Sequence, residues 1–182
     1  FSWLLLGGKC RSCKSKISLQ YPVIESLNGI LYVVICLVNG MDLFSLIYCL
    51  MTSALLTLSL IDWRTYEIPP GINAFLFILG VAAAVLDRGN LLSHLAGMVC
   101  VSGFLGILYL ISRGRAIGGG DIKLMSVSGL LIGGASMICA MCIGIITGGA
   151  YVTLMLVRKR LNKTDQFAFG PFLAFGLATA IF

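Results

Sequence analysis

The sequence predicts an all-α fold, a polytopic membrane bundle of about seven transmembrane helices behind a short cytoplasmic segment that contains cysteines. Composition is the first observation: 59% of the 182 residues are hydrophobic and 11% are charged, against about 25% charged in a typical soluble domain. The second is that the apolar residues fall in runs close to the length of about 20 residues that a helix needs to cross a bilayer. A water-soluble fold of this size could not bury so much apolar surface, so the lipid bilayer is the expected surroundings.

Polar or glycine-rich breaks divide the chain after residue 20 into apolar ranges. We expect residues 1–20 to be a cytoplasmic segment, the tail of a loop that begins upstream, and residues 21–182 to be one transmembrane domain. The chain begins with Phe1 rather than methionine, which favours a longer precursor. The expected spans are 22–38, 43–61, 71–87, 90–111, 122–135, 137–157 and 168–182.

The fifth and sixth spans are separated only by small residues. No charge occurs between Lys123 and Val157, a length of about 35 residues, which is close to two crossings at about 1.5 Å rise per residue. The glycines and serine of Gly133–Ser136 offer the turn. The fifth helix is then short, so its beginning at Asp121 should lie within or close to the membrane.

The net charge of +6 is explained by membrane topology, and no nucleic-acid partner is expected. Lys and Arg collect in cytoplasmic loops. With the N-terminus inside, twelve basic residues fall on the inner side and only Arg88 falls outside. Asp62 and Asp121 then both emerge on the cytoplasmic side. The inner basic residues are Lys9, Arg11, Lys14, Lys16, Arg64, Arg113, Arg115, Lys123, Arg158, Lys159, Arg160 and Lys163.

Asp62 ends a long apolar run, and its position has two interpretations. It marks the membrane boundary beside Arg64, or it belongs to a site. A carboxylate at the C-terminal end of a helix faces the negative end of the helix dipole, so this position is unfavourable without a further partner. Glu25 is similarly open between a helix-dipole partner at the beginning of the first span and a residue of a membrane cavity.

Asp121 follows Gly118, Gly119 and Gly120. Aspartate suits a helix N-cap, which is one reading. Three glycines exceed what a cap requires, and glycine permits unusual backbone angles and close approach of another chain. Irregular backbone at membrane depth is tolerated only where it lines a cavity or is buried in protein. The second reading is therefore a site.

Considered together, the two aspartates predict chemistry. Ionisable groups at membrane depth are costly and usually functional. If two carboxylates share a cavity, one keeps a proton; the ionised partner then activates water and the protonated one donates to a carbonyl oxygen. This is the arrangement of an aspartic protease. The same pair could serve a proton- or cation-coupled transporter, and a non-catalytic scaffold would leave the glycines unexplained.

Four stretches resemble the type IV prepilin leader peptidases, a family of bacterial membrane aspartic peptidases with a GxGD motif. They are "KCRSCKSKISLQYPVIESLNG" at Lys9–Gly29, "IDWRTYEIP" at Ile61–Pro69, "GGGD" at Gly118–Asp121 and "FGPFLAFG" at Phe169–Gly176. They occur in the family's order over nearly the whole chain. One departure is Pro70, where family members often have an acidic or amide residue.

The resemblance implies a multi-pass endopeptidase of the bacterial inner (cytoplasmic) membrane, with Asp62 and Asp121 as the catalytic residues. Its substrates would be type IV prepilins or type II secretion pseudopilins, cut after a glycine on the cytoplasmic side. Proteolysis would need no cofactor. Many family members also methylate the new N-terminus with S-adenosylmethionine, and we carry this activity only as an implication. Glu67 and Glu25 are candidates for contacts with the basic leader.

Cys10 and Cys13 form a CxxC in the polar N-terminal segment. The family typically has two such pairs there, and four thiolates would make a closed tetrahedral zinc site. One pair is half of that site, so zinc at Cys10 and Cys13 is a hypothesis that requires further ligands. The alternative is a reduced, solvated thiol pair.

Overall fold

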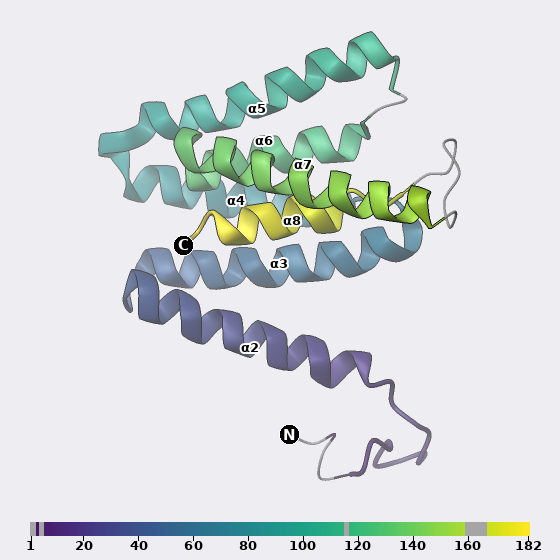
Figure 1. Ribbon diagram of the computed structural model, residues 1–182. Helices are drawn as coiled ribbons and strands as arrows, with labels where there is room; N and C mark the ends of the chain where they lie inside the picture. Colours follow the sequence, from purple (N-terminus) through teal and green to yellow (C-terminus); the bar gives the residue numbers. More distant parts are fainter. Residues whose placement is uncertain (1–2, 4–5, 115–116, 159–166) are drawn as a thin grey trace.

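From Gln20 onward the described part of the protein consists of helices and their short connections, which confirms the all-α prediction (Figure 1). The computed structural model describes Trp3 and residues 6–114, 117–158 and 167–182. Before the helices, an isolated antiparallel β-bridge joins Lys9 and Lys16. The helices are α2 (Gln20–Asn39), α3 (Leu43–Thr65), α4 (Pro70–Leu86), the short 3₁₀ helix η1 (Arg88–Asn90), α5 (Leu91–Ser112), α6 (Gly119–Ile132), α7 (Gly134–Val157) and α8 (Gly170–Thr179).

Each of the seven predicted apolar ranges coincides with one α-helix, but the number of membrane spans is not confirmed. Four helices are long and apolar enough to cross a membrane, namely α2, α3, α5 with η1, and α7. The other three are shorter, at 17 residues in α4, 14 in α6 and 10 in α8. At about 1.5 Å per residue, even α4 is shorter than the ~30 Å hydrocarbon core of a bilayer. The described helices therefore support an integral membrane protein with at least these four candidate spans.

Two of the short helices, α6 and α8, lie between other helices of the bundle. α6 packs against α5, α4, α7 and α8, and α8 packs against α7 and α3. Figure 1 shows α8 between α7 and α3, and α6 behind α7 between α5 and α4, whereas α2 lies at the edge and packs on α3. Because their neighbours cover them, these short helices do not need the length of a lipid-exposed span.

Glycines let the helices approach closely. A Cβ atom on Gly97 of α5 would lie 2.4 Å from the carbonyl oxygen of Gly129 on α6. A Cβ on Gly176 of α8 would lie 2.1 Å from the carbonyl oxygen of Ala140 on α7. Lipid is as apolar as the side chains, so association of membrane helices depends on close packing of this kind rather than on desolvation. These contacts fix the position of α6 and α8, the two helices whose N-termini reach the site described below.

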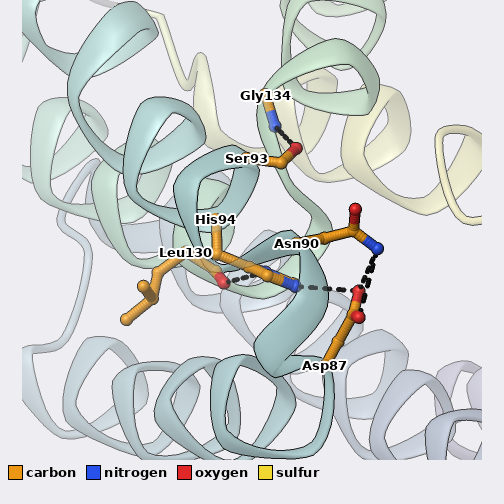
Figure 2. Close-up of polar contacts among 6 residues, drawn as sticks. All are labelled: Asp87, Asn90, Ser93, His94, Leu130 and Gly134. Atoms are coloured by element: carbon orange, nitrogen blue, oxygen red, sulfur yellow. Dashed lines mark hydrogen bonds and ion pairs between the residues drawn. The ribbon is translucent and has the colours of Figure 1, made fainter.

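The C-terminal end of α6 is held by α5 (Figure 2). Nδ1 of His94 lies 2.8 Å from the carbonyl oxygen of Leu130, and because a carbonyl only accepts, Nδ1 carries the proton. Nε2 of the same ring lies 3.5 Å from Oδ2 of Asp87. Ser93 Oγ accepts a 3.2 Å hydrogen bond from the backbone N–H of Gly134, the first residue of α7. These contacts tie the α6–α7 turn to the beginning of α5.

Three predicted boundaries are corrected. The turn between the fifth and sixth helices is Gly133 alone, with φ of 82°, rather than Gly133–Ser136. α3 continues to Thr65, so Asp62 lies in its last turn instead of just beyond it. Asp121 is the third residue of α6, and Gly118 occupies the N-cap position that was one reading of Asp121.

Candidate active site

A cavity of about 510 Å³ opens at one end of the bundle, where α3 ends and α4 and α6 begin. The link between α3 and α4 has only four residues, 66–69, which keeps these two helix ends together, and α6 joins them because it packs against α4. The cavity contains both aspartates singled out from the sequence. Its lining residues are Asp62, Tyr66, Glu67, Ile68, Pro70, Asn73, Gly118, Gly119, Gly120, Asp121 and Lys123.

Asp62 is buried, with 5% of its surface exposed, and it is held by the last helix. Its Oδ2 accepts a 2.9 Å hydrogen bond from the backbone N–H of Gly170, the first residue of α8. The first N–H groups of a helix lack partners within the helix and carry the positive end of its dipole. The N-terminus of α8 therefore supplies the partner that the unfavourable position of Asp62 in α3 required.

Gly170 is a site residue that the analysis of single residues missed. A Cβ at this position would lie 2.7 Å from Oδ2 and 3.0 Å from Cγ of Asp62, so only glycine allows the observed contact. The "FGPFLAFG" motif was noted from its resemblance alone, without a role for any of its residues. The available signal was a glycine beside Pro171, because proline favours the first turn of a helix and thus marks an N-terminus.

Asp121 is also buried, with 9% of its surface exposed, and its Oδ2 accepts a 3.3 Å hydrogen bond from the backbone N–H of Gly118. It thus caps the N-terminus of α6 from inside the helix, where a carboxylate is favoured by the dipole. The cap and the cavity readings of Asp121 are therefore compatible.

The three glycines before Asp121 have different surroundings. A Cβ on Gly118 would lie 3.1 Å from Oδ2 of Asp121, and one on Gly120 would lie 3.1 Å from Cβ of Ile68. Gly119 has open space around it. Two glycines thus permit tight packing at the beginning of α6, and the middle one leaves the cavity open beside Asp121.

The two aspartates use their oxygens in the same way. Each presents Oδ2 to a backbone N–H at the beginning of a helix. For each, Oδ1 has no hydrogen bond within the described residues, while the side chain lines the cavity. One oxygen of each carboxyl group is therefore fixed and the other is free to bind water or a ligand, which is the division that acid–base chemistry between two carboxyl groups requires.

Two further residues of the cavity were not foreseen. Tyr66 caps α3 in the left-handed conformation, with φ of 56°, which turns the chain sharply after Asp62. Asn73 is 8% exposed, and its Oδ1 is buried without a hydrogen-bond partner in the described part of the chain. Such an oxygen costs about 1–3 kcal/mol of stability. The signal in the sequence was an amide within the otherwise apolar run "GINAFLF".

The two glutamates proposed for leader contacts are separated by the fold. Glu67 is exposed and lines the cavity together with Lys123. Glu25 is exposed on α2 in the second helical turn, not the first, and does not line the cavity. The structure brings Glu67 to the aspartates and leaves Glu25 on the outer helix.

Cys10 and Cys13 lie in a tight turn of the N-terminal segment, away from the cavity. The backbone N–H of Cys10 donates to the carbonyl oxygen of Ser15 at 2.9 Å, and Cys13 Sγ lies 3.0 Å from Ser15 Oγ. Hydrogen bonding from Ser15 lowers the pKa of the Cys13 thiol to about 7. No group of three potential metal ligands occurs among the described residues. The pair fits half of a tetrahedral zinc site and does not complete one.

Comparison with known proteins places this geometry in a family. The profile of the type IV leader peptidase family matches residues 49–153, and that of the bacterial peptidase A24 N-terminal domain matches residues 1–39. The chain is 32% identical over 178 residues to the prepilin leader peptidase/N-methyltransferase of Neisseria gonorrhoeae, which covers 94% of this chain and 60% of that protein. It is 30% identical over 180 residues to the protein of the same name from Bacillus subtilis, and this alignment covers 96% of this chain and 71% of that protein.

A third relative, the type 4 prepilin-like proteins leader peptide-processing enzyme of Escherichia coli O78:H11, is 27% identical over 191 residues, covering 100% of this chain and 68% of that protein. No solved structure matches the chain significantly. The chain spans 60% of the length of the Neisseria relative. The profile match covers more than half of the chain and includes both cavity aspartates, and the chain therefore belongs to the type IV leader peptidase family.

Proposed function

We propose that this protein is an aspartic endopeptidase that removes the basic leader of type IV prepilins or type II secretion pseudopilins, cutting after a glycine. The observation that carries this proposal is the shared cavity of Asp62 and Asp121, each buried, each with one oxygen held by a helix N-terminus and one left free. The names of the relatives, which include leader peptidase and leader peptide-processing enzyme, support the substrate class.

In the proposed mechanism the two carboxyl groups hold one proton between them, because like charges in one cavity repel. The 2.9 Å hydrogen bond at the N-terminus of α8 favours Asp62 as the ionised partner. Asp62 takes a proton from water while the water oxygen attacks the scissile carbonyl carbon, and Asp121 donates its proton to the carbonyl oxygen. The resulting diol collapses with cleavage of the C–N bond: the leaving amine receives a proton from Asp62, and Asp121 takes a proton back from a diol hydroxyl, which restores the pair with one proton.

The proposed location is the bacterial inner membrane, with the N-terminal segment and both aspartates on the cytoplasmic side. Twelve of the thirteen Lys and Arg residues fall on that side in the predicted topology. The arrangement of the helices is consistent with it, because Arg64 at the end of α3 and Lys123 in the first turns of α6 lie at the same end of the bundle as the cavity.

Glu67 is the proposed contact for the basic leader, because its carboxylate lies exposed at the rim of the cavity. Lys123 lines the same cavity and would repel a basic residue placed beside it. Attraction must then act on the Glu67 side. We expect Glu67→Gln to raise the Michaelis constant of a prepilin more than it lowers turnover, and an unchanged Michaelis constant would remove Glu67 from leader recognition.

No cofactor is required for the proposed proteolysis. N-methylation of the new N-terminus is a further proposal that rests on the names of the relatives, and S-adenosylmethionine would supply the methyl group. Zinc binding by Cys10 and Cys13 also stays a proposal that requires two ligands besides the described ones. Zinc analysis of the purified protein that finds less than half an equivalent would end it.

Cleavage of a prepilin by the wild type and by the Asp62→Asn and Asp121→Asn variants, in detergent or membranes, tests the proposed function. We expect both variants to fold and to lose activity. Asp42→Asn is the matched control, since Asp42 begins α3 at the end opposite to Asp62. Cleavage at the wild-type rate by either folded variant would contradict the proposed mechanism.

A further inference from the structure

Asn73 is a polar residue of the cavity to which the proposed mechanism gives no task. It lies in the first turns of α4, is more than nine-tenths buried, and lines the cavity with Asp62 and Asp121. Its Oδ1 accepts no hydrogen bond from the described residues. The amide of an asparagine has one acceptor oxygen and two N–H donors, and here the buried acceptor oxygen is the atom without a partner among the described residues.

A structural role would require a partner, because polar groups in a membrane protein are costly when unpaired. Ser128 also has a buried side-chain oxygen without a partner in the described part of the chain. Unlike Asn73, Ser128 lies in the middle of α6 and does not line the cavity. Ser128 thus has an unpaired oxygen in the packed core, whereas Asn73 has one in the wall of the cavity that holds the two aspartates. Only Asn73 is placed where a ligand in the cavity could be its partner.

We infer that Asn73 binds the main chain of the substrate beside the scissile bond, an inference that rests on the proposed function. A peptide group offers one N–H and one C=O, which match the acceptor and the donors of a side-chain amide. The terminal torsion of asparagine is broad, so rotation turns either atom towards the cavity. A basic side chain of the leader would be better matched by a carboxylate, which Glu67 provides at the rim. Asn73 thus holds the neutral backbone rather than the charged leader.

The position of Gly119 supports a peptide backbone at this place. Open space surrounds the missing side chain of Gly119, which lines the same cavity beside Asp121. A substrate strand in that space lies against the beginning of α6 and faces Asn73 at the beginning of α4, since α4 and α6 pack against each other.

The test compares Asn73→Leu, which keeps the size of the side chain and removes its polar atoms, with the control Ser128→Ala. In the full chain, we expect Asn73→Leu to retain or raise the thermal unfolding midpoint, because it removes an unpaired buried group. Its Michaelis constant for a synthetic prepilin peptide should rise about tenfold, with kcat changed much less. Ser128→Ala should leave the Michaelis constant unchanged.

Peptides in which one backbone N–H near the cut is replaced by an ester oxygen provide the second measurement. If Oδ1 of Asn73 accepts from that N–H, the ester weakens binding to the wild type and has little further effect on Asn73→Leu, so the two changes are not additive. If the Nδ2 group donates instead, a peptide with a thioamide in place of the matching C=O gives the same non-additivity.

Additive effects at every position, or an unchanged Michaelis constant in folded Asn73→Leu, would overturn the inference. A lowered unfolding midpoint with kcat and kcat/KM reduced equally would assign Asn73 a structural role and would overturn it as well. The Asp121→Asn variant separates failure of this inference from failure of the proposed function. Cleavage of the peptide by Asp121→Asn would contradict the proposed function, whereas binding of the uncleaved peptide to Asp121→Asn lets the role of Asn73 be measured without cleavage.

Discussion

Gly170→Ala perturbs Asp62 without changing any ionisable group. The added Cβ would lie 2.7 Å from Oδ2 of Asp62, and ordinary contact begins at 3.4 Å, so the carboxylate and the beginning of α8 must separate. The hydrogen bond of 2.9 Å from the Gly170 N–H is then lost. Hydrogen bonds to charged groups contribute about 1.5–3 kcal/mol, which corresponds to roughly 10- to 150-fold in rate if the bond acts fully in the transition state.

The assay is cleavage of a prepilin at saturating substrate, together with thermal unfolding of the same preparation. Gly149→Ala on α7 is the matched control, since nothing lies within 4 Å of a Cβ at that position. We expect Gly149→Ala to keep the wild-type kcat. Gly170→Ala should have a much lower kcat, with a Michaelis constant close to the wild-type value.

A second variant keeps this prediction testable if Gly170→Ala is unstable. An Asp62→Ala background removes the atoms at 2.7 and 3.0 Å and leaves only Cβ, at 3.3 Å. Gly170→Ala should therefore destabilise the protein less in this background than it does alone, a coupling that a double-mutant cycle measures. A folded Gly170→Ala variant that cleaves at the wild-type rate would refute the role of α8 in positioning Asp62. Equal destabilisation with and without the Asp62 side chain would refute the predicted clash.

Three further predictions concern the fold and the N-terminal segment. Gly97→Ala should lower the thermal unfolding midpoint, because its Cβ would lie 2.4 Å from a backbone oxygen of α6. The control Gly103→Ala lies on the same helix with open space around it and should keep the midpoint. Equal midpoints in the two variants would contradict close packing of α5 on α6. His94→Leu removes the cap on the last turn of α6 and should cost about 1–3 kcal/mol of unfolding free energy in chemical denaturation, and wild-type stability would argue against that cap. The alkylation rate of Cys13 should rise with pH through about 7, since the thiolate is the reactive form and the lowered pKa makes it available near neutrality. Ser15→Ala should move this rise to higher pH, as followed by mass spectrometry, and an unmoved profile would exclude the hydrogen bond as its cause.

Much of the secondary structure was predictable because its signal is local. Each helix is an apolar run bounded by glycine, proline or charge, so the seven predicted ranges coincide with the seven α-helices from α2 to α8. The number of spans was less accessible, because the same apolar pattern describes a helix that faces lipid and one enclosed by neighbours. α6 and α8, with 14 and 10 residues, are enclosed.

The site shows the same division. Asp62 and Asp121 stand out in the sequence because both lie at the ends of apolar runs on the same side of the predicted topology, and the glycines before Asp121 mark an unusual backbone. Asn73 did not stand out, since a single amide in an apolar run becomes informative only when its burial and its missing partner are known. Glu25 looked equivalent to Glu67, and only the packing of α2 at the edge of the bundle separates them.

The sequence by itself determined that this chain forms apolar helices, where each begins and ends to within a few residues, and which two carboxylates are candidates for chemistry. Only the tertiary structure decided that the N-terminus of α8 serves Asp62, across 108 residues of sequence, and that an unpaired amide joins the two aspartates in one cavity. The physical reason lies in the range of the interactions. Helix formation and apolar run length depend on neighbours in sequence, whereas helix contacts in a membrane depend on where two small residues on distant segments allow their backbones to meet.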